Sequence, residues 1–405
     1  MTKINTTLRQ LVVWFTLIGL SACGGGSTST TPPTNPQRGD VVSVTPTISY
    51  DTTSLKNLST SSGLFSGYQV KMVYAVNVYK VVYWTADHSG SLLQASGLLA
   101  IPQNGFGSST AILNYDNGTI FADTDAPTNN PTMSLLAGLM ASTDFIVTIP
   151  DYIGYGSSVA ELHPYLHAES LANATIDLLR AAKRYLADNH IGLNGQLFLA
   201  GYSEGGYASV ATHKFLQQQY ASEFTVTADV AGDGPYDLSS TANTLLSGAT
   251  LPYAPYVAFV FKAYDDIYGW NRIADIFQPT YVDAVNNDFY GDHTTAQIES
   301  SLTNVTANLF TATFLNNYFS TGETEIKTRL AENNVYDWTP QAPVRLFHGP
   351  DDITVPYANA TTAQTTMSGN GASDVMVIDC AATPSTHSNC ALPYLNYMLG
   401  YFLTY

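Results

Sequence analysis

Short apolar runs alternate with amphipathic segments through most of the chain after residue 67. Each apolar run has the length of a strand, whereas Leu171, Ala174 and Leu178 recur at helical spacing within 169–188. Strands that alternate with helices predict an α/β fold with a mostly parallel sheet covered on both faces. Strands are expected over 68–76, 78–85 and 92–101 (an antiparallel meander), then 111–114, 145–149, 196–200, 226–231, 344–347 and 375–378, with further helices over 204–215 and near 392–402.

The interval 236–342 breaks this alternation. It shows no clear strands, many aromatic residues and mainly helical spacing, as in 253–268 and 294–319. An insertion of this length between two strands is most simply a helical cap over the strand ends. Plain scaffold without a gating role fits the same pattern.

The first residues have the pattern of a signal peptide over 1–22. Lys3 and Arg9 flank the start of a short apolar run that ends at Leu20 and is too short to span a bilayer comfortably. The letters Leu20-Ser21-Ala22-Cys23 resemble the lipobox of bacterial lipoproteins. The resemblance implies cleavage before Cys23 and lipidation of that cysteine, with palmitate among the acyl groups. Because Gly24 stands where inner-membrane lipoproteins carry Asp, it also implies an outer-membrane location, on the periplasmic or the outer surface. An ordinary signal peptide with an incidental cysteine is the alternative.

The segment 23–45 is rich in Gly, Ser, Thr and Pro and contains few residues that could be buried. Such a composition predicts a flexible tether, lipidated at Cys23, between the membrane and one domain over 46–405. The formal charge of −17 argues against a nucleic-acid partner, because phosphate binding requires a cationic face.

Three cysteines occur in the chain. With Cys23 lipidated, Cys380 and Cys390 remain as an even pair in an oxidising compartment, and we expect them to form a disulfide. The spacing of the cysteines is not that of a metal site, and no metal or cofactor is expected.

The sequence Gly201-Tyr202-Ser203-Glu204-Gly205 fits the G-x-S-x-G nucleophile elbow. Its glycines permit a sharp turn between a strand and a helix, and an apolar strand and an amphipathic helix are expected on either side. This context makes Ser203 the candidate nucleophile. Serine needs a neighbouring base, and the base needs an acid that fixes its tautomer.

The acid and the base are expected downstream in the order Asp or Glu, then His. The segment 344–356, in which a strand ends at His348-Gly349 and Asp352 precedes Val355-Pro356, resembles the acid loop of α/β-hydrolases. Asp352 holds the spacing of that loop, with Asp351 as the near alternative and Asp233 or Asp237 as more distant ones. His387 is the candidate base because it alone among the histidines follows Asp352. A structural role is expected for the other histidines: His88, His163, His167, His190, His213, His293 and His348.

An oxyanion hole is expected from two backbone N–H groups, one of Glu204 and one of Gly118 or Thr119 in the loop at 113–119. That loop, the segment 149–156 and His163-Pro164-Tyr165-Leu166 look like the secretory lipases and related bacterial esterases of the α/β-hydrolase superfamily. The resemblance covers 114–234 and 344–387, and leaves the cap unmatched. Relatives often carry His-Gly where this chain has Asn117-Gly118.

The resemblance implies an α/β-hydrolase fold and a serine hydrolase that cleaves carboxylic esters without a cofactor. Aromatic residues of the expected cap, such as Tyr253, Phe261 and Trp270, favour an apolar acyl or aryl substrate group. Two alternatives stay open. A serine peptidase shares this fold and triad, and a lipoprotein that only binds at the surface could keep the same scaffold.

Overall fold

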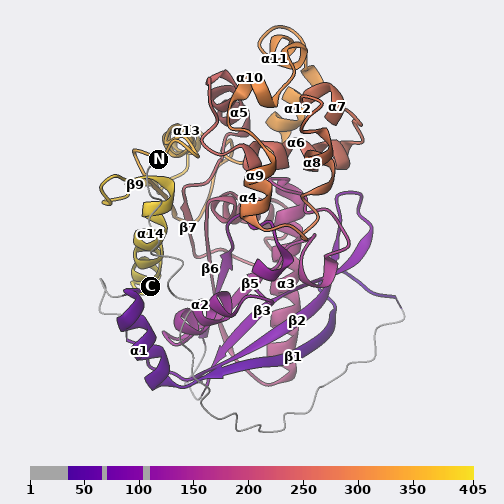
Figure 1. Cartoon of the computed structure of the whole chain (residues 1–405). Helices are drawn as coiled ribbons and strands as arrows, with labels where there is room; N and C mark the ends of the chain where they lie inside the picture. The colour runs from indigo at the N-terminus through magenta and orange to yellow at the C-terminus, as the bar shows by residue number, and fades with distance from the viewer. Residues whose placement is uncertain (1–34, 66–70, 104–109) are drawn as a thin grey trace.

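A computed structural model describes residues 35–65, 71–103 and 110–405 of the chain. These residues form one nine-stranded sheet with helices on both faces (Figure 1). The strands are β1 (Val41–Tyr50), β2 (Val76–Ala86), β3 (Leu92–Pro102), β4 (Thr110–Asp116), β5 (Phe145–Pro150), β6 (Leu193–Tyr202), β7 (Ala228–Gly232), β8 (Val344–His348) and β9 (Val375–Asp379).

The strand order is β1-β2-β3-β5-β4-β6-β7-β8-β9. Strands β1, β2, β3 and β5 pair antiparallel, and β5, β4, β6, β7, β8 and β9 pair parallel. Every residue of β4, β5, β7 and β8 is buried, because helices cover both faces of the parallel part. The parallel strands therefore end side by side at one edge of the sheet, as the alternating pattern predicts.

Helices of two groups cover the sheet. Leu136 of α2 and Met398 of α14 pack with Phe198 and Val230 on one face, together with Leu55 of α1. Helix α3 packs with α4 on the other face, and α13 contacts β8 and β9. The covering helices are α1 (Thr52–Ser62), α2 (Pro131–Ala141), α3 (Ala168–Asp188), α4 (Glu204–Gln219), α13 (Ala358–Gly369) and α14 (His387–Phe402), with the 3-10 turns η2 (Asp123–Asp125) and η3 (Gly156–Ser158).

The segment between β7 and β8 folds into short helices gathered at one end of the sheet (Figure 1). Aromatic contacts hold them together, such as Phe259 with Phe289 at 4.8 Å and Phe277 with Phe310 at 5.0 Å between ring centroids. This segment, predicted at 236–342, is called the cap below. Its helices are α5 (Leu238–Ser247), α6 (Ala254–Tyr268), α7 (Ile273–Ile276), α8 (Val282–Asn287), α9 (Thr295–Ser301), α10 (Thr306–Leu309), α11 (Ala312–Tyr318) and α12 (Thr324–Glu332).

The structure corrects the start of the domain. The first strand of the meander is β1, which begins at Val41 inside the segment predicted to be a tether up to residue 45. Before it, the Arg38 guanidinium binds the Asp177 carboxylate of α3 at 2.9 Å. The strand predicted over 68–76 is wrong in its described part, because 71–75 form no strand and β2 begins at Val76.

The predicted signal peptide over 1–22, the lipidation of Cys23 and most of the tether lie outside the described residues. Within the parts of the chain that are described, none of the helices combines the length and the apolar character that crossing a bilayer requires.

Candidate active site

Ser203 lies in a sharp turn between β6 and α4. Its backbone has φ 62° and ψ −121°, a conformation that non-glycine residues rarely adopt and that is held here by the surrounding packing. Glycine is required on both sides of it. A Cβ on Gly201 would lie 2.1 Å from the Gly205 carbonyl oxygen, and a Cβ on Gly205 would lie 2.0 Å from that of Asp116. The elbow predicted from the sequence therefore forms, and its glycines serve close backbone approach.

The structure brings Ser203, His387 and Asp352 together from three separate segments. Nε2 of His387 lies 2.9 Å from the Ser203 Oγ, and Nδ1 lies 2.6 Å from the Asp352 Oδ2. The other Asp352 oxygen accepts the backbone N–H groups of Thr354 and Val355 at 2.8 and 3.0 Å. The carboxylate is thus fixed by its own loop while one oxygen faces the imidazole.

His387 is the first residue of α14, a helix that the sequence predicted only from about residue 392. Burial lowers the pKa of the imidazole, but the hydrogen bond and charge of Asp352 outweigh it, so that the pKa lies above its usual value. An ionised Asp233 would add a smaller contribution in the same direction.

The alternative acids lie elsewhere. Asp351 accepts the backbone N–H and the hydroxyl of Ser385 at 2.9 and 3.0 Å, and so joins the acid loop to the segment before His387. Asp237 accepts the Ser240 N–H at the start of α5. Asp233 follows β7, and its Oδ2 lies 3.9 Å from the His387 Nδ1, beyond hydrogen-bond distance.

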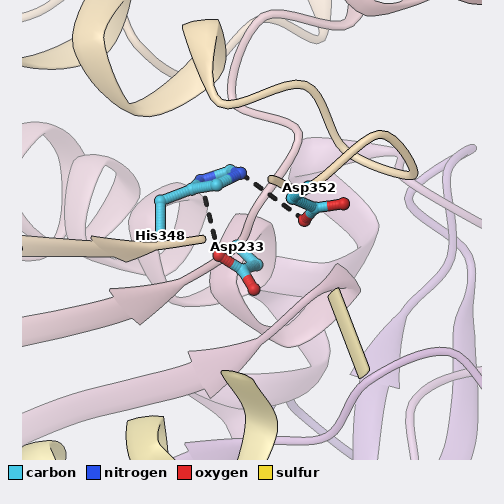
Figure 2. A group of neighbouring side chains, drawn as sticks. All are labelled: Asp233, His348 and Asp352. Atoms are coloured by element: carbon cyan, nitrogen blue, oxygen red, sulfur yellow. Dashed lines mark ion pairs between the residues drawn. The ribbon is translucent and has the colours of Figure 1, made fainter. Parts of the chain in front are cut away.

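Ligand-type atoms of Asp233, His348 and Asp352 lie within 4.8 Å of one another in the buried region behind the triad (Figure 2). All three groups have other partners, and Asp233 accepts the Gly349 N–H at 2.9 Å. The Asp352 Oδ2 accepts from His387, and the His348 Nε2 lies 3.0 Å from the Val355 carbonyl oxygen, to which it can only donate. The arrangement is therefore explained by hydrogen bonds that hold the acid loop.

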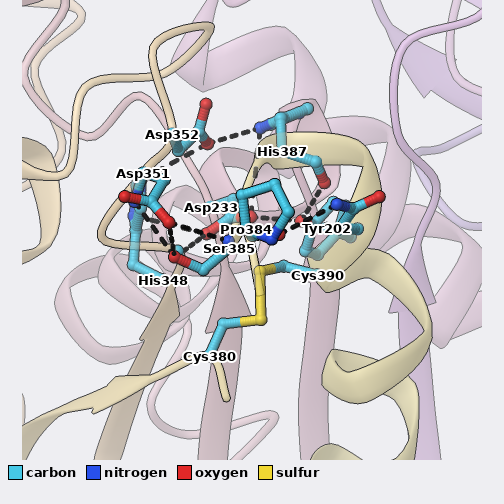
Figure 3. The surroundings of a disulfide bond; sticks show 12 residues. Tyr202, Asp233, His348, Asp351, Asp352, Cys380, Pro384, Ser385, His387 and Cys390 are labelled. Atoms are coloured by element: carbon cyan, nitrogen blue, oxygen red, sulfur yellow. Dashed lines mark hydrogen bonds and ion pairs between the residues drawn. A yellow bond between two sulfur atoms is a disulfide. The ribbon is translucent and has the colours of Figure 1, made fainter. Parts of the chain in front are cut away.

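Cys380 and Cys390 form a disulfide, which confirms the predicted pairing. It links the residue after β9 to the first turns of α14, beneath His387 (Figure 3). Cys390 is fully buried, and the Cys380 N–H donates to the His348 carbonyl oxygen at 2.9 Å. The disulfide thus joins α14, which begins at His387, to the end of β9, and the hydrogen bond of Cys380 joins this point to the end of β8.

The residues expected to form the oxyanion hole lie next to the elbow. Glu204 is the first residue of α4, where backbone N–H groups lack partners within the helix. A Cβ on Gly118 would lie 3.7 Å from the Ser203 Cβ, which places this glycine beside the nucleophile. The Thr119 hydroxyl lies 2.9 Å from that of Tyr165.

Sequence reasoning missed the partner of Glu204. The His163 Nε2 lies 2.6 Å from the Glu204 Oε1, and the His163 Nδ1 lies 2.7 Å from the Ile153 carbonyl oxygen. Both side chains are buried. His163 therefore has the structural role expected for it, and it contacts the residue directly after Ser203. The two residues are 41 positions apart in the sequence, and no motif there indicates the contact.

A pocket of about 630 Å³, including its open mouth, extends from Ser203 into the cap. Ser203 and Glu204 line it at the end of the sheet, and Leu245 of α5 with Val260 and Phe261 of α6 line it from the cap. Its walls are almost entirely apolar. A substrate carbonyl at Ser203 would thus have its apolar group against the cap.

The family model of the secretory lipases matches residues 126–388, which is more than half of the chain and includes Ser203, Asp352 and His387. The chain belongs to the secretory lipase family. This membership agrees with the exported protein that the sequence predicts.

A secreted triacylglycerol lipase of Malassezia furfur is 26% identical over 266 residues, which are 63% of this chain and 64% of that protein. The match thus spans less than two thirds of the relative. Among solved structures, a putative hydrolase of Legionella pneumophila is 27% identical, with a TM-score of 0.82 over 90% of this chain and 97% of its own. The rice cell wall degrading esterase LipA of Xanthomonas oryzae is 25% identical, with a TM-score of 0.79 over 89% and 97%. These similarities confirm the predicted α/β-hydrolase fold.

Proposed function

We propose that this secretory lipase family member hydrolyses carboxylic esters through an acyl-enzyme on Ser203. The observation that carries the proposal is the continuous set of contacts from the Ser203 Oγ through His387 to Asp352, at the base of an apolar pocket. A nucleophile, a base and an orienting acid in these contacts are the requirements of acyl transfer.

His387 acts as base and then as acid. Its Nε2 takes the Ser203 proton as Oγ attacks the ester carbonyl, and the resulting imidazolium is stabilised by Asp352 at Nδ1. The imidazolium then protonates the leaving alcohol, and the acyl group remains on Ser203. A water that gives its proton to His387 attacks the acyl-enzyme, and the imidazolium then returns this proton to the Ser203 Oγ as the acid is released.

The oxyanion of each tetrahedral intermediate accepts hydrogen bonds from the backbone N–H of Glu204 and from that of Gly118 or Thr119. The position of Gly118 beside Ser203 and of Glu204 at the start of α4 supports this assignment. The buried contact of the Glu204 side chain with His163 keeps the first turn of α4 in place.

The acyl group is apolar and occupies the pocket between Ser203 and the cap. Its walls offer aliphatic and aromatic contacts from Val260, Phe261 and Leu330, and few polar partners. An acyl chain or an aryl group would gain about 25 cal/mol for each Å² of apolar surface removed from water.

The substitution Ser203→Ala tests the proposal. Turnover of an aryl ester should fall by roughly four to six orders of magnitude, since the triad members act as a unit. Thermal unfolding should stay close to that of the wild type. A variant that keeps a tenth of the activity would rule out Ser203 as nucleophile.

Parallel assays with an aryl ester and an aminoacyl arylamide test the reaction class. The proposal expects turnover of the ester to exceed that of the amide. Faster cleavage of the amide would instead identify a peptidase with the same triad.

We also propose that Cys23 carries a lipid that anchors the protein to the bacterial outer membrane. Leu20-Ser21-Ala22-Cys23 and Gly24 support this assignment. The substitution Cys23→Ser should release active protein from the membrane fraction, because serine has no thiol to carry the lipid and the protein then lacks its anchor. Equal membrane binding of variant and wild type would contradict the lipobox assignment.

A further inference from the structure

Behind the imidazole of His387, Tyr202 connects a second buried carboxyl to the main chain of that residue. The Tyr202 hydroxyl oxygen lies 2.6 Å from the His387 carbonyl oxygen and also within hydrogen-bond distance of the Asp233 Oδ2 (Figure 3). Asp233 directly follows β7, is fully buried and has a positive φ of 44°. A non-glycine residue is held in this conformation only where the surroundings determine it.

The number of hydrogen atoms on the Tyr202 hydroxyl, the Asp233 carboxyl and the His387 carbonyl decides which oxygen donates in each hydrogen bond. A tyrosine hydroxyl carries one hydrogen, and a backbone carbonyl oxygen can only accept. If Tyr202 donated to an ionised Asp233, its oxygen and the His387 carbonyl oxygen would face each other at 2.6 Å without a hydrogen between them. If Tyr202 instead donates to the carbonyl, the Asp233 Oδ2 must carry the hydrogen that it shares with Tyr202. Only the second arrangement satisfies all three oxygens.

The other contacts of Asp233 agree with a neutral carboxyl. Its Oδ1 accepts the Gly349 N–H at 2.9 Å, as the carbonyl oxygen of a protonated acid does. The Nδ1 of His348 lies 3.7 Å from the same oxygen and has no hydrogen-bond partner, while Nε2 donates to Val355. His348 thus has the contacts of a neutral imidazole with its hydrogen on Nε2.

Burial raises the pKa of the Asp233 carboxyl, and the nearby Asp352 charge raises it further. A positive charge on His348 or His387, or a hydrogen bond donated by Tyr202 to this carboxyl, would act in the opposite direction. A carboxylate at Asp233 would also lie 3.9 Å from the His387 Nδ1 and compete with Asp352 for the imidazole.

We propose that Asp233 is a neutral hydrogen-bond donor that acts through Tyr202 to hold the main chain of His387, and thereby positions the base. Asp352 is then the one carboxylate at the imidazole, and Asp233 is a positioning residue that never touches substrate. The kinetic part of this inference depends on the proposed ester hydrolysis. The protonation state of Asp233 does not.

Three variants test whether Asp233 acts as a neutral hydrogen-bond donor or as a negatively charged carboxylate. Asp233→Ala and Tyr202→Phe each break the connection, and each should lower kcat by about 10- to 100-fold with little change in KM, because small displacements of a base are costly. Asp233→Asn keeps an N–H donor toward Tyr202 and a carbonyl acceptor toward Gly349. It should restore most of the activity that Asp233→Ala loses, and the acid limb of its pH–rate profile should match the wild type.

A loss in Asp233→Asn as large as that in Asp233→Ala, or an acid limb shifted to lower pH, would show that a charge is required and would overturn the proposal. A kcat equal to that of the wild type in both Asp233→Ala and Tyr202→Phe would also overturn the proposal, because the connection would then have no effect on the base. Infrared difference spectra of the wild type against Asp233→Asn at neutral pH give a readout without turnover. The proposal expects the carbonyl stretch of one protonated carboxyl to disappear, and an unchanged carbonyl region would contradict it even in a variant that is inactive.

Discussion

The end of the sheet and the cap line the same pocket but are built in different ways. At the sheet, Ser203 is held by backbone contacts so close that Gly201 and Gly205 cannot carry a side chain. In the cap, short helices are joined by aromatic side chains, such as the rings of Phe261 and Phe314 at 5.4 Å. Backbone contacts define the position of a reacting atom, whereas packed side chains define the shape of a wall.

The difference predicts two kinds of defect. Changes at the strand ends should lower turnover of every substrate alike, because they act on the reacting atoms. Changes in the cap should alter the preference among substrates and leave the chemistry in place. Substitutions on either side of the pocket therefore test whether the two regions act differently.

The largest effect is expected from Asp352→Asn at the sheet. Loss of the carboxylate at the His387 Nδ1 should lower kcat by roughly three to four orders of magnitude, with little change in KM. Asp351→Asn is the matched control, because it loses only contacts with Ser385 and should cost much less. Steady-state kinetics on one aryl ester measure both variants. A larger loss in Asp351→Asn would move the acid by one residue.

A smaller and selective effect is expected from Val260→Trp in α6. The larger ring should fill the part of the pocket that the cap provides, and lower kcat/KM for long acyl esters by about 10-fold or more relative to acetyl esters, since it excludes several methylenes. Val305→Trp, on the surface of the cap, is the control. The measurement is a series of aryl esters of increasing acyl length. An equal loss for all lengths would mean that the cap acts on the chemistry itself.

A modest effect on turnover is expected from the double variant Cys380→Ser/Cys390→Ser. Closing a loop of this size stabilises the fold by roughly 2–3 kcal/mol. His387 keeps other restraints, since Asp351 holds Ser385 and Tyr202 contacts the His387 carbonyl oxygen. We therefore expect turnover to fall by no more than about tenfold where the protein stays folded. Thiol titration of the denatured, unreduced wild type checks the link, and two free thiols would exclude it.

The smallest effect concerns Asp116, which lies at the end of β4 under the elbow. Burial raises the pKa of its carboxyl to about 7, against about 4 in the unfolded chain. The folded state therefore binds this proton more tightly, and the stability it provides is lost as the pH rises through 7. Between pH 5 and 8 the loss is on the order of 2–3 kcal/mol.

Asp116→Asn removes this titration. Urea unfolding of the variant should show a smaller decline in stability between pH 5 and 8 than the wild type does. Equal declines in the two proteins would mean that Asp116 is ionised throughout this range.

The sequence was sufficient to predict the features that depend on local pattern. The parallel strands, the elbow at Ser203 and the helical character of the cap follow from short motifs and spacing. Strand β1 was missed because Val41–Tyr50 contains Pro46 and several Thr and Ser residues, and its pairing with β2 decides its structure. The start of α14 at His387 was missed because Pro393 lies within that helix.

Contacts between distant residues could not be predicted in the same way. His163 and Glu204 are 41 residues apart, and Tyr202 and Asp233 are 31 apart. Tyr202 and Asp233 meet because β6 and β7 end beside each other, and His163 reaches Glu204 from the loop between β5 and α3. Both contacts depend on the order of the strands in the sheet. Asp233 was weighed only as an alternative acid, and its contacts with Tyr202 and Gly349 became visible in the structure alone.

Labelling with a fluorophosphonate, followed by mass analysis of the peptides, tests directly whether Ser203 is the nucleophile. The reagent phosphonylates an activated serine and needs no knowledge of the natural substrate. We expect one adduct per chain, on the peptide that contains Ser203, and at least a hundredfold slower labelling in His387→Ala, because that variant lacks the base. A folded wild-type protein that takes up no label, or carries it on another serine, would exclude Ser203 as the nucleophile.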